Sequence, residues 1–467
     1  MINTASSAEV TAGNYARLLA PMPPISLAYV AAALKQARID VSVYDDYTER
    51  GGRDTLFDRI RKYSPDVVGL SCVTVTAPRT FEIAAEIRND FPDIRIVMGN
   101  IHPSVFYEDI LNRNLADAVV LGEGEVTAVK LVEAWASGGK LDEVKGIAFR
   151  DNGSVKTTGV QDFVADLDSL PFPAWELFPV NRYRIFSFAS VKEPGTLILG
   201  SRGCPFNCTF CSLKIMGRRR RRRSSSNIAD EFEYLHGRFG YVQPSFIDPI
   251  FPLSKKEAFE FSEELIKRGL EKKMIWITET RVDLVDEEML KAMRRSGLRR
   301  IMYGFESGTQ EGIDIIRKNF TVEQARKAVE ATRRAGVEII GFFMIGVPGD
   351  SVKSIEETIK FAASLDIDFA KFTVFSPFPG TAVYDEMLEN GTIPPDADWE
   401  HYTNYPSKET PAVFIPQGVT NDDLIRLQRK ALVKFYIRPK MIFRHLFRIR
   451  TLRLKDILDG VAALMKR

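Results

Sequence analysis

Short apolar runs rich in β-branched residues alternate with helical patterns over the first 150 residues of the chain. The run at residues 66–71 has the composition of a fully buried strand, and the apolar spacing at residues 79–90 predicts a helix after it. Buried strands separated by helices are typical of a parallel, doubly wound, Rossmann-like sheet. The predicted strands are residues 40–44, 66–71, 94–99 and 118–121, and the predicted helices are residues 24–36, 55–62, 79–90 and 126–136.

A second pattern begins near residue 196, where a strand followed by a helix recurs along the chain. The repeat predicts a partial TIM-type (βα)6 barrel, whose active site would lie at the carboxyl ends of its strands. The predicted strands are residues 196–200, 245–248, 274–279, 300–303, 339–345 and 369–375. The predicted helices are residues 226–239, 255–268, 287–296, 322–335 and 354–364.

The two α/β units are joined by a segment with a different character. A hairpin is predicted at residues 146–150 and 154–158 around Asp151-Asn-Gly153, and a connector stiffened by two prolines follows at residues 170–175. We therefore divide the chain into a Rossmann-like domain, a linker, a barrel and a C-terminal helical, basic segment. The predicted boundaries are 1–145, 146–190, 191–400 and 401–467.

Composition agrees with a globular enzyme of more than one domain. The length of 467 residues exceeds what one hydrophobic core usually holds. The composition, 45% hydrophobic and 27% charged residues, is typical of globular proteins. A formal net charge of +2 gives no general case for nucleic-acid binding. No apolar stretch is long enough to span a membrane, and residues 1–15 lack the features of an export signal. We expect a cytoplasmic protein.

Three of the four cysteines, Cys204, Cys208 and Cys211, lie within eight residues. A C-x3-C-x2-C loop can bind three irons of a four-iron cluster by thiolate and leaves the fourth iron open to a small molecule. Structural zinc is the competing interpretation, but it needs four ligands, and no fourth Cys or His stands nearby at suitable spacing. A disulfide is disfavoured because the number of cysteines on the loop is odd.

The cysteine triplet, with aromatic Phe210 before its last cysteine, resembles the cluster loop of the radical S-adenosylmethionine (SAM) superfamily. The resemblance implies that SAM chelates the open iron of a [4Fe-4S] cluster. An electron from the reduced cluster would then cleave SAM to methionine and a 5′-deoxyadenosyl radical that abstracts hydrogen from an unactivated carbon. A reducing partner such as flavodoxin or ferredoxin is also implied.

The resemblance further assigns SAM contacts at the ends of the barrel strands. The backbone of Phe210 would contact adenine, and Glu306 would reach the ribose or the methionine portion. Asp248 would contact the methionine amino group, or would be a solvent-facing loop carboxylate. Arg281 would pair with the SAM carboxylate, or would form a structural ion pair with Glu279 or Asp283. The full set is Phe210, Asp248, Arg281, Glu306, Ser307, Gly346 and Pro348.

The loops at residues 71–76, 99–104 and 122–125 follow predicted strands and resemble those of the cobalamin-binding domain found in one branch of this superfamily. No D-x-H-x-x-G motif is present, because Asn100 stands two residues before His102. Cobalamin should therefore lack a histidine lower ligand, and His102 can alternatively be a loop histidine satisfied by backbone hydrogen bonds. The assigned positions are Ser71, Thr74, Gly99, Asn100, His102, Pro103, Gly122, Glu123, Gly124 and Glu125.

Two charged segments leave alternatives open. The six arginines Arg218 to Arg223 are predicted to be solvated, and the alternative is that one or two face the barrel mouth and meet SAM or an anionic substrate. The basic, apolar-rich segment 435–450 can cap the barrel or rest on an anionic membrane surface, and we favour the cap.

The resulting hypothesis is a cobalamin-dependent radical SAM enzyme that methylates an unactivated carbon of an unknown small molecule. The first alternative is a radical cyclase or oxidoreductase that resembles the tetrapyrrole cyclases and transfers no methyl group. An alternative of another class is a non-catalytic cobalamin or iron–sulfur sensor.

Overall fold

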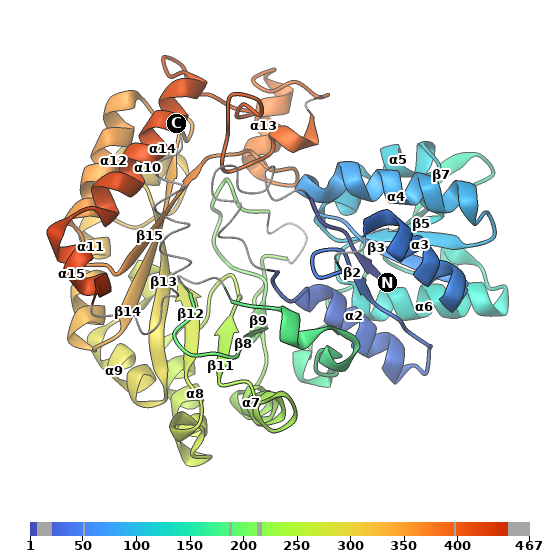
Figure 1. Ribbon diagram of the computed structural model, residues 1–467, viewed down its shortest axis with the longest axis horizontal. Coiled ribbons are helices and arrows are strands. Elements are labelled where there is room, and N and C mark those ends of the chain that lie inside the picture. Colours follow the sequence, from blue (N-terminus) through green and yellow to red (C-terminus); the bar gives the residue numbers. More distant parts are fainter. Residues whose placement is uncertain (7–20, 50–51, 186–188, 213–216, 397, 447–467) are drawn as a thin grey trace.

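The computed structural model describes residues 1–6, 21–49, 52–185, 189–212, 217–396 and 398–446. Two large sheets organise this part of the chain, and the first domain lies beside the open side of the barrel (Figure 1). A third, two-stranded antiparallel sheet consists of β9 (Ser201–Arg202) and β10 (Arg221–Arg222). Both the Rossmann-like fold and the partial barrel predicted from the sequence are confirmed.

The first sheet has seven strands in the order β2-β1-β3-β4-β5-β6-β7. The strands from β2 to β5 run parallel, and β6 and β7 form the predicted hairpin, antiparallel to β5. The hairpin therefore extends the first sheet, so the boundary drawn at residue 145 falls within that sheet. The strands are β1 (Ile2–Asn3), β2 (Tyr44–Asp45), β3 (Val67–Ser71), β4 (Arg95–Gly99), β5 (Ala118–Val120), β6 (Ile147–Asp151) and β7 (Ser154–Thr157).

The helices of the first domain differ from the prediction at one place. A kinked helix, α5, follows β4 and was not predicted, because it contains Pro103 and departs from helical geometry at Phe106. The predicted strand at residues 40–44 was also too long, since pairing begins only at Tyr44. The helices are α2 (Ile25–Gln36), α3 (Gly52–Tyr63), α4 (Ala77–Asp90), α5 (Ile101–Asn112) and α6 (Gly124–Ser137).

The second sheet has six parallel strands in the order β15-β14-β13-β12-β11-β8, and all six were predicted. Helices cover its outer face (Figure 1). The strands are β8 (Gly195–Ile198), β11 (Gln243–Phe246), β12 (Trp276–Thr280), β13 (Leu298–Glu306), β14 (Glu338–Ile345) and β15 (Phe369–Val374). The helices are α7 (Ser225–Phe239), α8 (Lys255–Lys267), α9 (Glu287–Arg295), α10 (Gln310–Ile315), α11 (Val322–Arg334), α12 (Val352–Ser364) and α13 (Ala382–Glu389).

The first domain and the connector close one side of the barrel. Ala28 of α2 and Trp175 of the connector are buried in a cluster with Ile277 and Met302, which belong to barrel strands. Burial of this apolar surface fixes the first domain against the barrel. The loops that follow the strands of the two sheets are thereby brought together.

Two further helices, α14 (Asn421–Tyr436) and α15 (Pro439–Leu446), pack on the outside of the barrel. Phe435 and Met441 are each 1% exposed and belong to the barrel core, as expected of a cap. Ile437 and Phe443 are exposed. The rest of the predicted basic segment, residues 447–467, lies outside the described residues. None of the described helices is long and apolar enough to cross a membrane.

Candidate active site

The cysteine loop follows β8 and carries thiols that are free of disulfides. Cys204 is buried, Cys208 is half-buried and Cys211 is exposed. Among the described residues, no three His, Cys, Asp or Glu side chains could hold one metal ion. A four-iron cluster does not require such convergence, because each thiolate binds a different iron. The residues present therefore fit a cluster better than a single zinc ion.

Asp248 anchors the start of this loop. Its carboxylate accepts hydrogen bonds from the backbone N–H of Gly200 at 2.9 Å and from the hydroxyl of Ser201 at 2.6 Å. The side chain is 2% exposed, so the alternative of a solvent-facing carboxylate is wrong. Burial raises the pKa of Asp248 to about 7, although both hydrogen bonds oppose the rise.

The raised pKa of Asp248 predicts a pH-dependent loss of stability. The folded protein holds this proton up to about pH 7, whereas the unfolded chain releases it near the ordinary value of 3.8. Stability should fall as pH rises between these values. Asp248→Asn keeps a hydrogen-bond acceptor and cannot ionise. The melting temperature of this variant should therefore rise relative to that of the wild type as pH increases over this interval. Thermal melts at several pH values test this, with exposed Asp422→Asn as control. A constant difference across the interval would contradict it.

A second group of charges lies where β13 ends. Glu306 has a positive φ of 63° and accepts a hydrogen bond from the ammonium of Lys318 at 2.7 Å. Lys318 also lies 5.5 Å from the centre of the Phe210 ring, and its positive charge opposes the rise that burial causes in the pKa values of the Cys204 and Cys211 thiols. Sequence reasoning missed Lys318, because it follows α10 and belongs to no strand end. Its proximity to Glu306 and the cysteine loop is visible only in three dimensions.

Arg281 takes the structural role that the sequence left as an alternative. Its guanidinium donates to both carboxylate oxygens of Asp283, at 2.9 and 3.0 Å. It also lies 3.8 Å from the centre of the Phe206 ring, with Nη1 4.0 Å from Cys208 Sγ. Arg281 therefore fastens the cysteine loop to the end of β12.

Ser307 and the turn after β14 are held by hydrogen bonds to their own surroundings. The Ser307 hydroxyl lies 3.2 Å from the hydroxyl of Thr309 and 3.4 Å from that of Thr358. Asp350 accepts from the backbone N–H of Gly346 at 2.9 Å, and Pro348 lies within the same turn. Gly346 has φ of 78°, which favours glycine there.

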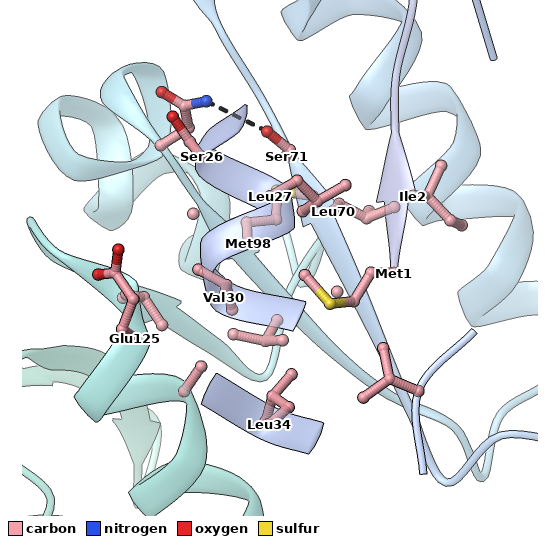
Figure 2. Close-up of a pocket in the computed structure, with 18 of the residues that line it drawn as sticks. Met1, Ile2, Ser26, Leu27, Val30, Leu34, Leu70, Ser71, Met98 and Glu125 are labelled. Atoms are coloured by element: carbon pink, nitrogen blue, oxygen red, sulfur yellow. Dashed lines mark hydrogen bonds between the residues drawn. The ribbon is translucent and has the colours of Figure 1, made fainter. Parts of the chain in front are cut away.

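A cavity of about 710 Å³ lies mostly between α2 and the first sheet and extends to the barrel mouth, where the two domains meet. Ser26, Leu27, Val30 and Leu34 of α2 form one wall, and apolar side chains of the strands, including Leu70 and Met98, form the opposite wall (Figure 2). Cys211 and Ser212 of the cysteine loop also line it. Residues of both predicted cofactor sites thus line one cavity.

Seven of the ten positions predicted to contact cobalamin line this cavity, and Thr74, His102 and Pro103 do not. Asn100 donates to the Ser71 hydroxyl at 3.1 Å. Gly122 has φ of 85°, and a Cβ on Gly124 would approach Val30 to 3.1 Å. Gly124 therefore lets α6 approach α2 closely at the edge of the cavity. The seven are Ser71, Gly99, Asn100, Gly122, Glu123, Gly124 and Glu125.

Glu123 and Glu125 also connect the two domains. Arg202, next to the cysteine loop, forms ion pairs with both carboxylates, and Arg221 forms a bidentate pair with Glu123 at 2.8 and 2.9 Å. Burial disfavours the charge on Glu123, but Arg221 and Arg202 hold its pKa below the ordinary value. We call Arg202, Arg221, Glu123 and Glu125 the interdomain ion-pair network.

The predicted solvation of the arginine run was wrong for three of its six members, Arg220, Arg221 and Arg223, whereas Arg218, Arg219 and Arg222 are exposed. Arg220 pairs with Glu257 at 2.7 Å, and Arg223 pairs with Glu231 in the interior. Arg221 and Arg223 are only 8% and 4% exposed. The physical reason is that α7, α8 and the loop after β5 supply a carboxylate to each of the four successive arginines Arg220 to Arg223. Arg222 keeps an exposed pair, with Glu260.

His102 lies in an aromatic cluster and does not face the cavity. Its ring centre is 4.7 Å from that of Phe106 and 4.8 Å from that of Trp399. Neither ring nitrogen has a hydrogen-bond partner among the described residues, so the predicted backbone hydrogen bonds are wrong. Burial lowers the pKa of His102 to about 3.

The chain is similar to known proteins in both sequence and fold. Residues 13–132 match the B12 binding domain, and residues 198–362 match the radical SAM superfamily. The chain is 32% identical to the uncharacterized methyltransferase PH0819 of Pyrococcus horikoshii over 91% of this chain and 90% of that protein. It is 29% identical to the anaerobic magnesium-protoporphyrin IX monomethyl ester cyclase of Cereibacter sphaeroides over 97% of this chain and 73% of the relative.

The fold is similar to that of TsrM from Kitasatospora setae, a radical SAM methyltransferase solved with cobalamin and a [4Fe-4S] cluster bound. The TM-score is 0.71 at 17% sequence identity, over 91% of this chain and 90% of that one. The likeness in fold includes both domains, since it extends over nearly the whole of each chain.

Fold and site together define a radical SAM enzyme with a B12-binding domain. The chain belongs to the cobalamin-dependent radical SAM methyltransferase family, and its relatives include cyclases as well as methyltransferases. The predicted family and the predicted cofactors, cobalamin, SAM and its iron–sulfur cluster, are confirmed by these matches.

Proposed function

We propose that this protein methylates an unactivated carbon of a small molecule that enters the cavity where the first domain meets the barrel. The observation that supports this is the shared cavity, which is lined by the loops of the B12-binding domain and by Cys211 of the cysteine loop. When bound, the cluster and SAM supply a radical that removes a hydrogen atom, and cobalamin supplies the methyl group. Both reagents would then face one substrate.

The residue assignments form part of this proposal. Cys204, Cys208 and Cys211 would bind the cluster, and Asp248 and Arg281 would hold the loop that carries them. Glu306 and Lys318 would meet the polar portion of SAM, because their ion pair lies beside Phe210. The seven cavity-lining residues of the first domain would contact cobalamin, with no ligand from His102.

The experiment is an anaerobic reaction of the loaded enzyme with SAM labelled in its methyl group, a reductant and a small-molecule extract of the source cells. Labelled methyl in an extract component, together with 5′-deoxyadenosine, supports methylation. 5′-Deoxyadenosine and an altered extract component without label would instead support a cyclase or oxidoreductase. This alternative is retained because one relative, 29% identical to this chain, is a cyclase. Absence of both products would contradict an enzymatic role and favour the sensor.

Location and partners are also proposals. We infer a cytoplasmic enzyme that takes electrons from a flavodoxin or ferredoxin, since four cysteines in 467 residues and an iron–sulfur cluster suit a reducing compartment. The exposed Ile437 and Phe443 beside basic Arg438 and Lys440 leave peripheral membrane contact as the alternative role of the C-terminal segment.

Vesicle binding separates the barrel cap from a lipid contact. Because Phe435 and Met441 pack in the barrel core, we expect the full-length protein to stay in solution with vesicles that contain anionic lipid. Truncation after Tyr436 should lower the melting temperature, since it removes Met441 from that core. Co-sedimentation that salt abolishes, with an unchanged melting temperature after truncation, would favour lipid instead.

A further inference from the structure

Two oppositely charged side chains lie inside the barrel without a hydrogen-bonded partner among the described residues. Glu279 is on β12 and Lys371 is on β15, at separate positions in the six-stranded sheet. Both are partly buried. A charge removed from water without a close partner is unfavourable, so its retention calls for a physical explanation.

Strand alternation places both side chains on the inner face. Successive side chains of a strand point to opposite faces. Ile277 and Phe369, two residues before Glu279 and Lys371 respectively, belong to the cluster that fills the inner side of the barrel. Trp276 and Phe372, which have the opposite parity, belong to the core beneath the helices. Glu279 also lines the cavity where the first domain meets the barrel.

Strands β13 and β14, which lie between β12 and β15, place no charged residue in register with Glu279 or Lys371. Glu279 is in register with Met302, and Lys371 is in register with Phe342, which is itself opposite Gly304. The other charges that act on Glu279 are those of Lys318 and Glu306, which are bonded to each other and lie over Gly304. Burial raises the pKa of Glu279 to about 7, and the charges of Lys318 and, less strongly, of Lys371 oppose this rise. Burial lowers the pKa of Lys371, and the charge of Glu279 opposes that shift.

We propose that Lys371 and Glu279 bind the polar end of the methyl-accepting substrate, Lys371 an acidic group and Glu279 an N–H or O–H donor of the same molecule. This inference rests on the proposed function. An ammonium inside a barrel favours an anion, and a carboxylate favours a donor, because each gains a charge-assisted hydrogen bond that the substrate-free protein lacks. The substrate is thus expected to carry a carboxylate, phosphate or phosphonate.

The test uses the cobalamin- and cluster-loaded enzyme with methyl-labelled SAM and the extract of the source cells. Methyl-accepting activity should be retained on an anion exchanger at neutral pH. Retention also at about pH 3 identifies a phosphate or phosphonate, because a carboxylate is then largely protonated. Activity that passes through the exchanger both at neutral pH and at about pH 11, where an amino group is largely uncharged, would overturn the assignment of Lys371.

Variants test the two residues on the purified acceptor. Lys371→Met and Glu279→Gln should each raise the KM for the acceptor by about ten- to a hundredfold, the loss expected of one charge-assisted hydrogen bond. Lys430→Met and Glu356→Gln, from an exposed ion pair on the outer helices, are the matched controls and should leave KM unchanged. A loss that falls on the affinity for SAM alone would assign the pair to SAM and overturn the proposal.

Stability separates this role from a structural one. Without substrate, Glu279→Gln and Lys371→Met should keep or raise the melting temperature, because each removes a poorly compensated charge from the interior. A marked drop in both would indicate a structural ion pair and contradict the proposal. If the wild type transfers no label at all, the proposed function fails; if it transfers label and both variants keep the wild-type KM, only the present inference fails.

Discussion

Replacing Cys204, Cys208 and Cys211 together by alanine should abolish the visible absorption of the reconstituted cluster and all cleavage of SAM. Three thiolates are the only protein ligands that the loop offers to the irons, and a cluster without them has no attachment. Iron content, the visible spectrum and 5′-deoxyadenosine formation under anaerobic conditions measure the result. The expected loss is complete.

The fourth cysteine provides the matched control. Cys72 is fully buried at the end of β3, in the core of the first domain. Cys72→Ala removes one thiol from the chain and leaves the loop intact, so iron content and SAM cleavage should persist, with a modest loss of stability. Bound iron and SAM cleavage in the triple variant would refute the cluster assignment.

The second large effect concerns the interdomain ion-pair network. Arg202→Met should lower the free energy of unfolding by about 3–5 kcal/mol, because it leaves the buried carboxylate of Glu125 without its cation. The same change should weaken the position of the cysteine loop, which begins two residues later. Denaturant unfolding and cluster content are the measurements.

An exposed arginine from the run Arg218 to Arg223 is the control for this prediction. Arg222 pairs with Glu260 on the surface, so Arg222→Met should change the free energy of unfolding by less than about 1 kcal/mol. The double variant Arg202→Met with Glu125→Gln should recover part of the loss, since the uncompensated charge is gone. Equal effects of Arg202→Met and Arg222→Met would show that the network contributes no more than a surface pair.

The sequence by itself determined the parts of this protein that depend on local pattern. Buried strand runs and amphipathic helices predicted all six barrel strands, because the period of apolar residues reports which faces are covered. The cysteine spacing predicted the cluster, because its three ligands lie on one short loop. Helix α5 was not predicted, because Pro103 and the kink at Phe106 disturb the helical pattern.

Only the tertiary structure decided which charges meet. The pairing of Arg221 with Glu123 and the positions of Glu279 and Lys371 on one inner face join residues far apart in the chain. The ion pairs of Arg223 with Glu231 and of Lys318 with Glu306 join residues closer in sequence, but the fold decides that both pairs are buried. The local sequence pattern around a charged residue is the same whether its side chain is solvated, forms an ion pair or binds a ligand. Its role depends on the carboxylates and ammonium groups that folding brings within a few ångströms, and on how much water folding removes.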